Sequence, residues 1–300
     1  MRQSLIMLTV NILTLVLYSC KDKESIEPVV EISPIDKSIT AIAIHEKDVW
    51  VGTGMNGIFK KDGDSWINYT ELNGLPSNQI TALAISDNGV VWAGTYAGIS
   101  KYECEEWITF KEENGLPINI TYSLGFDNHG NLLIGNSRNS FTIYDGSSFS
   151  VTQVSGTIGH IHTIANDSEE NIWVGSCRTG LSMFDGQVWT HSIHNRNVFV
   201  NAIFITINGD IWVGDPFGAH RLSGSTWLTY NESDGLIHDY SLCFTEDLQN
   251  NIWIGTNKGL SRFNGTEFIT HKNNSIMALA CDTDGNIWVG EWDGLSIIAP

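Results

Sequence analysis

Three histidines are the best candidates in the sequence for metal binding or acid–base catalysis. His160 and His162 are two residues apart, so that in a β-strand both imidazoles project from the same side. His194 follows in a later stretch that departs from the surrounding pattern. Imidazole is a common metal ligand and a general base near neutral pH. Because the spacing places no third ligand beside His160 and His162, the sequence favours a hydrogen-bonded or solvated pair, with no metal and no other cofactor.

Standard catalytic motifs are absent. The sequence has neither a Gly-x-Ser-x-Gly elbow nor a glycine-rich loop that would cradle phosphate. His45 and Glu46 begin a zinc-protease motif whose second histidine is missing. The stretch 282–286, Asp-Thr-Asp-Gly-Asn, begins like a calcium loop but lacks the distal glutamate, so a hairpin turn is the better interpretation. We therefore predict no catalytic residue.

A second set of residues suits ligand binding rather than catalysis. Arginine forks bind carboxylates, sulfates and phosphates through paired hydrogen bonds. Aromatic rings stack on sugars or on peptide side chains. The alternative is that exposed loops simply carry polar residues and a few aromatics. The candidate ligand-binding residues are Tyr96, Arg138, Arg178, Arg196, Phe217, Lys258 and Trp292.

A sequence repeat must position these residues. Its clearest copy is Asn-Ile-Trp-Val-Gly at 286–290, and near-copies recur with their glycines 35 to 42 residues apart. Self-similarity at a period near 40 residues is typical of repeat architectures. We expect each repeat glycine to precede a turn with unusual backbone angles. The repeat glycines are Gly52, Gly94, Gly135, Gly175, Gly214, Gly255 and Gly290.

Each repeat reads as one blade of a β-propeller. The unit that starts at Ile80 contains four short strands separated by turns, at 80–85, 90–94, 99–102 and 105–110. The sequence therefore predicts an all-β fold, a seven-bladed β-propeller of four-stranded antiparallel blades. The last repeat ends after three strands, so we expect residues 29–32 to pair there as an N-terminal strand that completes the last blade and closes the ring.

The propeller fold assigns most tryptophans to the core and gathers the candidate loops on one face. The loops between second and third strands, and those between blades, emerge together around the central channel. That geometry brings the candidate residues to one face, with Arg138, Arg178 and Arg196 on consecutive blades. Ten tryptophans follow the repeat, which leaves Trp292 as the tryptophan that the scaffold does not explain.

The N-terminus carries a targeting signal. Arg2 precedes an apolar run that is too short to span a bilayer comfortably, and Leu-Tyr-Ser-Cys at 17–20 closes it. The last four residues resemble a bacterial lipobox, in which Cys20 is lipidated. We expect a lipoprotein signal peptide at 1–19, a tether at 20–27 and the propeller at 28–300. An ordinary signal peptide that happens to contain a cysteine is the alternative.

Charge and cysteine content restrict the partners. A net charge of −18 argues against nucleic acid and repels anionic lipid headgroups, so membrane contact is expected only through the lipid anchor. The expected location is the bacterial cell envelope, at the outer membrane. Four cysteines remain, without paired spacing, and both disulfides and buried thiols stay open. These cysteines are Cys104, Cys177, Cys243 and Cys281.

The repeat also resembles a known family. Asp-Gly-Asn-Ile-Trp-Val-Gly at 284–290, Gly-Thr-Asn-Lys-Gly-Leu-Ser-Arg-Phe at 255–263 and Asn-Gly-Leu-Pro-Ser-Asn at 73–78 are similar to the two-component regulator propeller repeat. The resemblance covers residues from about 38 to 298. In that family the repeats form extracytoplasmic sensor domains of membrane histidine kinases. This chain shows no kinase, so the resemblance implies a free-standing lipoprotein form with a ligand- or partner-binding role.

The expected function is therefore an envelope-anchored, non-catalytic propeller that binds a glycan, a peptide or an envelope protein, as a sensor or accessory. One alternative is a metal-dependent propeller lyase or hydrolase, because streptogramin lyases have similar Gly-Asn-Ile-Trp repeats; it would use His160, His162 and His194. Another alternative is a structural scaffold in an envelope complex. The fold alone does not separate these functions.

Overall fold

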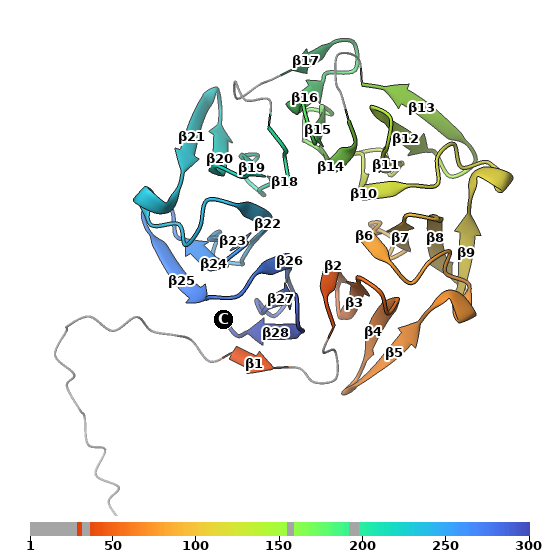
Figure 1. The fold of residues 1–300 in the computed structure, drawn as a ribbon, viewed down its shortest axis with the longest axis horizontal. Helices are drawn as coiled ribbons and strands as arrows, with labels where there is room; N and C mark the ends of the chain where they lie inside the picture. Colours follow the sequence, from red (N-terminus) through yellow and green to blue (C-terminus); the bar gives the residue numbers. More distant parts are fainter. Residues whose placement is uncertain (1–28, 32–36, 155–158, 192–197) are drawn as a thin grey trace, which may run out of the picture.

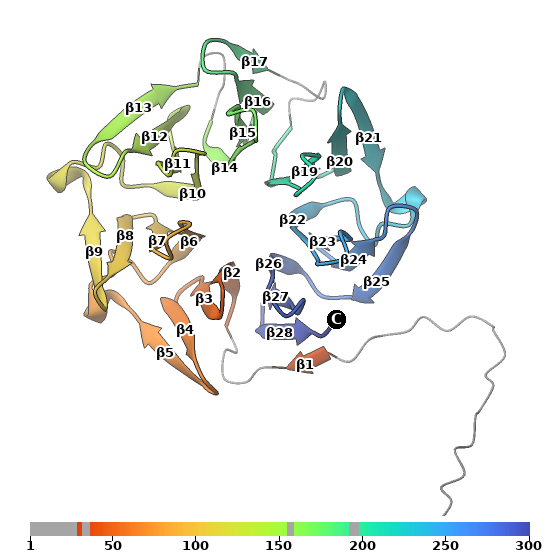
Figure 2. The same cartoon turned by 180° about the vertical axis from the view of Figure 1, so that it is seen from behind.

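The chain folds into a ring of seven sheets around a central channel (Figures 1 and 2). This is a computed structural model, and it describes residues 29–31, 37–154, 159–191 and 198–300. Each sheet has four antiparallel strands. Six sheets follow sequence order from the channel outward, and in the seventh β26, β27 and β28 are followed by β1. The predicted seven-bladed all-β propeller is confirmed.

Blades 1 to 3 follow the repeat closely, and short 3-10 helices lead from blade 1 to blade 2 and from blade 2 to blade 3. Their elements are β2 (Ile39–His45), β3 (Asp48–Thr53), β4 (Ile58–Asp62), β5 (Ser65–Tyr69), η1 (Glu71–Asn73), β6 (Ile80–Ile85), β7 (Val91–Thr95), β8 (Gly98–Glu103), β9 (Glu106–Phe110), η2 (Glu112–Asn114), β10 (Thr121–Phe126), β11 (Leu132–Asn136), β12 (Ser140–Tyr144) and β13 (Phe149–Gln153).

Blades 4 to 6 continue the ring, and blade 7 combines the C-terminal strands with one strand from the N-terminal part. Their elements are β14 (Ile161–Asn166), β15 (Ile172–Ser176), β16 (Gly180–Phe184), β17 (Trp189–His191), β18 (Ala202–Ile205), β19 (Ile211–Asp215), β20 (Gly218–Ser223), β21 (Thr226–Tyr230), η3 (Glu232–Asp234), β22 (Ser241–Glu246), β23 (Ile252–Thr256), β24 (Gly259–Phe263), β25 (Phe268–Lys272), β26 (Ile276–Cys281), β27 (Ile287–Glu291), β28 (Leu295–Ile298) and β1 (Val29–Glu31).

The outer position of blade 7 is taken by β1. This strand runs antiparallel to β28, with Val29 opposite Ile298 and Glu31 opposite Ser296. Every other blade fills the same position with its own fourth strand. The strand that starts the described chain therefore pairs with the strand that ends it, in the place that the sequence predicted for residues 29–32.

The repeat glycines lie inside strands. Several of the turns that follow them have the unusual backbone angles that the sequence predicted, with a positive φ at Gly57, Gly98 and Arg138, but the repeat glycines themselves do not. Gly52 belongs to β3, and none of the repeat glycines has a positive φ. Their role is close packing instead. A Cβ on Gly52 would lie 2.6 Å from Cγ2 of Ile80 in blade 2, and a Cβ on Gly290 would lie 2.6 Å from Cγ2 of Ile39 in blade 1. A side chain at these positions would push neighbouring blades apart.

A carboxylate anchors the repeat tryptophan in three blades. The indole nitrogen of Trp288 donates to Asp282 at 2.8 Å, and the amide of Asn286 donates to the same carboxylate. Burial alone would raise the pKa of Asp282, but these hydrogen bonds hold it below its usual range. The carboxylate of Asp282 is therefore used by a hairpin turn, in agreement with the interpretation of 282–286 as a turn rather than a calcium loop.

The six tryptophans before the repeat glycines are core residues, as predicted, whereas three of the four in the fourth strands, Trp66, Trp189 and Trp227, are half-buried. Trp173 is 5% exposed, whereas Trp292 is 69% exposed. We expect Trp173→Ala to lower the free energy of unfolding by about 3–5 kcal/mol, because it leaves a cavity and removes the hydrogen bond from the indole to Asp167. The matched change Trp292→Ala should shift it by no more than about 0.5 kcal/mol. Urea denaturation of both variants tests this, and equal losses would contradict the assignment.

Candidate functional site

The central channel is a cavity to which every blade contributes. Its cavity has a volume of about 290 Å³ and is lined by the first strands of all seven blades. Most of its lining side chains are aliphatic or small, such as Ala41, Leu83 and Ala278. The channel wall itself thus offers little chemistry, and polar groups gather at one end.

A β-bulge places one residue of each first strand at that end. In β2, Ile39 pairs with Thr53 and Ala41 pairs with Gly52, so Thr40 is left out of register. The same shift occurs in β6, β10, β14, β22 and β26. Bulges redirect a side chain away from the ladder. We call these half-buried residues, with the equivalent Asn201 of blade 5, the channel mouth: Thr40, Thr81, Tyr122, His162, Asn201, Leu242 and Met277.

The channel mouth lies beside the loops that the sequence selected. The register sets the first residue of β2 opposite the last residue of β3, immediately before the loop that leads to β4. The same holds in the other shifted blades, so these loops surround the mouth. Tyr96, Phe217 and Trp292 occupy such loops and are half or more exposed. Arg138, Arg178 and Lys258 are also exposed there.

An aromatic row crosses the mouth from blade 2 to blade 5. Tyr96 meets Tyr122 edge to face at 5.8 Å between ring centroids. Tyr122 stacks on His160 at 4.8 Å and contacts His162 at the same distance. His162 then contacts Phe199 at 4.4 Å. We call these five residues the aromatic row, and they form one continuous wall.

Burial keeps two rings of the aromatic row, His162 and Tyr122, in their neutral forms near neutral pH. Burial, followed by the nearby His160, lowers the pKa of His162 from 6.5 to about 4. Burial also raises the pKa of Tyr122, with smaller contributions from Tyr96 and Cys177. Both rings therefore keep their neutral forms and can donate or accept hydrogen bonds. The buried Nδ1 of His160 has no hydrogen-bond partner within the described ranges.

Backbone hydrogen bonds fix the two arginine loops around His160. The amide of Asn139 donates to the carbonyl of Gly159 at 2.9 Å, and the amide of Cys177 donates to the carbonyl of His160 at 3.2 Å. Arg138 precedes Asn139, and Arg178 follows Cys177. Both guanidinium groups are therefore carried by loops tied to the same short segment, next to the aromatic row.

The structure unites only part of the predicted site. Tyr96, His160 and His162 meet in the aromatic row, with Arg138 and Arg178 beside it. The other three candidates lie farther round the ring, on blades 5, 6 and 7: Phe217, Lys258 and Trp292. Among the described residues, Trp292 makes no ring–ring contact with the aromatic row, and Lys258 makes no cation–π contact with it. Arg196 and His194 lie outside the described residues, as does Cys20.

Sequence reasoning missed Tyr122 and Phe199. Tyr122 sits in a strand that was interpreted as scaffold, and only the bulge turns it into the channel mouth. The available signal was the residue directly before the one that pairs with the repeat glycine in each first strand, as Thr40 stands before Ala41, the partner of Gly52. At that position the blades carry threonine, tyrosine, histidine, asparagine, leucine or methionine, which is far more variation than a core position shows.

Metal and thiol chemistry find little support at the described residues. No group of three or more histidine, cysteine, aspartate or glutamate side chains there is arranged to hold a metal ion. The four described cysteines form no disulfide. Burial raises the pKa of the Cys281 thiol to about 11 and raises that of Cys243 further still, so both stay protonated.

No described helix has the length and apolar character needed to cross a membrane.

Comparison with protein families supports the repeat assignment. The family model described as two component regulator propeller matches residues 74–97 and 270–293. The chain is thus a seven-bladed propeller that carries two component regulator propeller repeats. No curated protein matches its sequence.

Solved structures show the same fold. One is the extracellular domain of BT4673 from B. thetaiotaomicron, described as a hybrid two component system, with 19% identity, a TM-score of 0.74, and 91% of this chain and 40% of that chain covered. The chain therefore spans less than half of that domain. Virginiamycin B lyase from Staphylococcus aureus matches with 14% identity and a TM-score of 0.75, and the match covers 90% of this chain and 97% of the lyase. The WD40 beta propeller domain of Doa1 matches with 13% identity and a TM-score of 0.71, and the match covers 90% of this chain and 96% of that domain.

The lowered pKa of His162 makes stability depend on pH. An unfolded histidine takes up a proton below about pH 6.5, whereas folded His162 stays neutral down to about pH 4. The unfolded state binds more protons in this window, so stability falls as the pH drops from 6.5 to 4. We expect His162→Gln to reduce this loss, as measured by urea midpoints at pH 7, 5.5 and 4.5. The exposed His129→Gln is the control, and identical pH slopes in all proteins would refute the prediction.

Proposed function

We propose that the channel mouth binds an anionic ligand that also presents a flat or apolar group, such as an acidic glycan or an acidic, aromatic peptide. The protein would act as a non-catalytic, sensor-like binding propeller of the bacterial envelope. The observation that carries this proposal is the aromatic row flanked by Arg138 and Arg178, whose loops are tied to Gly159 and His160.

Charge distribution supports an anionic partner. The chain has a net charge of −18, so an anion would be repelled by most of its surface. Two exposed guanidinium groups on adjacent blades provide a local exception. Guanidinium forks bind carboxylates and sulfates through charge-assisted hydrogen bonds. The neutral rings of Tyr122 and His162 offer stacking without adding charge, so the arginines and the aromatic row make complementary contributions.

Backbone preorganisation adds to the argument. Asn139 also accepts a hydrogen bond from the amide of Gly159 through its side chain. Gly159 has a φ of +117°, and a Cβ there would lie 2.2 Å from Sγ of Cys177. The chain thus crosses between the two loops where only glycine fits. A loop held in this way loses less conformational freedom when a ligand binds.

Direct binding tests the assignment. The probes are a galacturonate trisaccharide, its neutral galactose counterpart and the peptide Glu-Tyr-Glu, measured by calorimetry at low salt. We expect at least one acidic probe to bind, and the Arg138→Ala/Arg178→Ala double variant to weaken that binding about 10- to 100-fold. Lys47→Ala/Lys61→Ala removes the same charge from other parts of the protein and should change it less than about twofold.

Three outcomes would overturn the proposal. Equal losses in both double variants would show that only net charge matters. Turnover of a probe that disappears with His160→Ala or with a chelator would indicate the enzyme alternative. Binding of none of these probes, together with stable assembly with an envelope protein that both double variants retain, would indicate a scaffold.

Envelope anchoring through Cys20 is part of the same proposal. It rests on the sequence, because the cysteine closes an apolar run at a lipobox-like Leu-Tyr-Ser-Cys. We expect the protein expressed in a Gram-negative host to incorporate radiolabelled palmitate and to fractionate with membranes. Cys20→Ala should abolish the label. Label retained in Cys20→Ala, or a wild-type protein released in soluble form, would contradict the lipid anchor.

A further inference from the structure

The turns on the opposite face differ among blades in one hydrogen bond. In blades 4, 6 and 7 an aspartate six residues before the repeat tryptophan accepts its indole N–H. The donor–acceptor distances are 2.7 Å for Trp173 and Asp167, 2.8 Å for Trp253 and Asp247, and 2.8 Å for Trp288 and Asp282. We call this contact the indole clamp. It joins the turn between the first and second strands to the core of the blade.

Among the described residues, blades 1, 2 and 5 have a repeat tryptophan without the indole clamp; in blade 1, Ile44 stands six residues before Trp50, whose indole nitrogen is buried without a partner. Blades 2 and 5 carry a hydroxyl side chain at that place instead. Ser86 stands six residues before Trp92, and Thr206 stands six residues before Trp212. The hydroxyl of Ser86 accepts from the amide of Val90 at 3.1 Å and bonds Asn88. The Ser86 side chain is one bond shorter than the aspartate of blades 4, 6 and 7, so its hydroxyl does not reach the indole nitrogen. Within the described ranges, the indole nitrogens of Trp92 and Trp212 donate no hydrogen bond.

A cleft lies beside each of these two tryptophans. The cleft between blades 2 and 3 has a volume of about 230 Å³, and that between blades 5 and 6 has a volume of about 70 Å³. Both are lined by the repeat tryptophan and by the basic residue opposite it in the third strand, Lys101 or Arg221. The two clefts are therefore equivalent places in the repeat.

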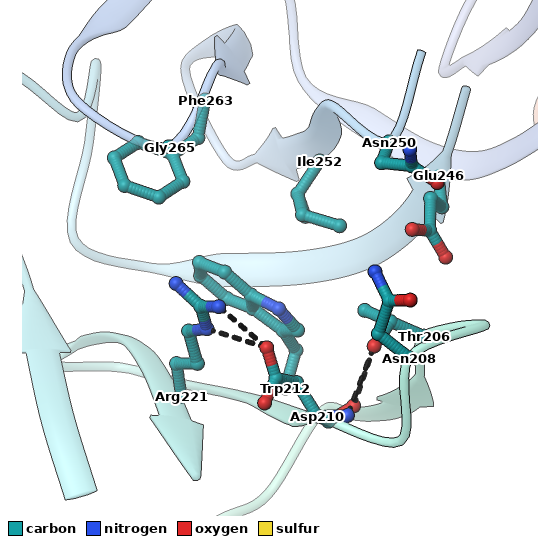
Figure 3. Close-up of a pocket in the computed structure, with 10 residues that line it drawn as sticks. All are labelled: Thr206, Asn208, Asp210, Trp212, Arg221, Glu246, Asn250, Ile252, Phe263 and Gly265. Atoms are coloured by element: carbon teal, nitrogen blue, oxygen red, sulfur yellow. Dashed lines mark hydrogen bonds and ion pairs between the residues drawn. The ribbon is translucent and has the colours of Figure 1, made fainter. Parts of the chain in front are cut away.

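An ion pair explains why one cleft is small. In blade 5, Nε of Arg221 donates to Asp210 at 2.9 Å, and the guanidinium lies 5.8 Å from the ring centroid of Trp212 (Figure 3). The Arg221 side chain therefore fills space beside the indole. In blade 2, Val90 takes the place of Asp210, and Lys101 pairs with Glu103 on its own strand at 2.7 Å. The larger cleft is left beside Trp92.

The larger cleft combines an apolar wall with hydrogen-bonding groups of both kinds. Phe126 and Tyr144 line it, and the Tyr144 ring meets Trp92 at 5.5 Å. Trp92 and Lys101 supply donors, and Glu103 supplies acceptors. Lys101 is paired with Glu103, and the other carboxylate of the lining, Asp145, accepts hydrogen bonds from Ser147 and Ser148 of its own turn. The lining therefore has no unpaired cation for an anionic ligand, and the cleft favours an uncharged one. A hydroxyl group can accept from the indole and donate to a carboxylate at the same time.

We propose that the cleft between blades 2 and 3 is a second binding site, for a neutral polyhydroxylated ring of the pyranose class. The apolar face of such a ring packs on aromatic side chains, and its hydroxyls match the mixed donors and acceptors. A volume of about 230 Å³ is below the ~300–1,000 Å³ of drug-sized pockets, which suits one ring. This site is separate from the channel mouth, because it lies at the turns between first and second strands.

The indole resonance of Trp92 provides a direct test. The probes are the methyl glycosides of glucose, galactose and mannose, with glucuronate and acetate as charged comparisons. Each is added to ¹⁵N-tryptophan-labelled protein at about 10 mM, tenfold above a ~1 mM dissociation constant. Trp92→Phe assigns the resonance. We expect a saturable shift of the Trp92 N–H with at least one neutral glycoside and none with acetate.

Restoring the clamp should remove the site without unfolding the protein. Ser86→Asp places a carboxylate where blades 4, 6 and 7 have one, so it should abolish the shift while urea stability stays equal or rises. Thr206→Asp makes the same change in blade 5 and should leave glycoside binding unchanged, as should Arg138→Ala/Arg178→Ala. No shift with any neutral glycoside, an equal shift with acetate, or full binding by a stable Ser86→Asp protein would overturn the proposal.

Discussion

The close approach between each repeat glycine and the next blade is the contact on which the structure depends. A Cβ on Gly94 would lie 2.7 Å from Thr121, and one on Gly255 would lie 2.8 Å from Ile276. The residue that packs against the glycine is the one directly before the bulge. Tyr122 follows Thr121, and Met277 follows Ile276. One steric constraint therefore sets the spacing of the blades and also presents a ring of side chains at the channel mouth.

Variation within this constraint creates the two candidate sites. At the channel mouth, the scaffold fixes where the side chain emerges but leaves its identity open, and blades 3 and 4 place Tyr122 and His162 there. On the opposite face, blades 4, 6 and 7 use an aspartate to satisfy the indole N–H. Where Ser86 takes that place, the donor is left for another partner and the packing beside it is open. Departures from the repeat are thus more informative about function than the repeat itself.

Much of the fold could be predicted from the sequence because a period near 40 residues and four short strands per period leave few alternatives. The core role of tryptophans such as Trp173 and the pairing of the first strand with the last blade follow the same logic. The role of the repeat glycines could not be predicted, because it depends on an approach between blades rather than on local geometry. The same limit applies to Tyr122, whose orientation is set by a register shift.

The channel mouth separates stacking from charge, and the separation has a physical cause. Burial keeps His162 neutral and keeps the Tyr122 phenol protonated, so these two rings at the centre of the aromatic row carry no charge across the neutral range. The charge available to an anion then comes from Arg138 and Arg178, which are exposed and screened by salt. Salt therefore weakens the arginine contribution while leaving stacking on the row nearly intact. The binding affinity that remains at high ionic strength therefore measures the contribution of stacking on the aromatic row. The affinity that is lost measures the contribution of the charges of Arg138 and Arg178.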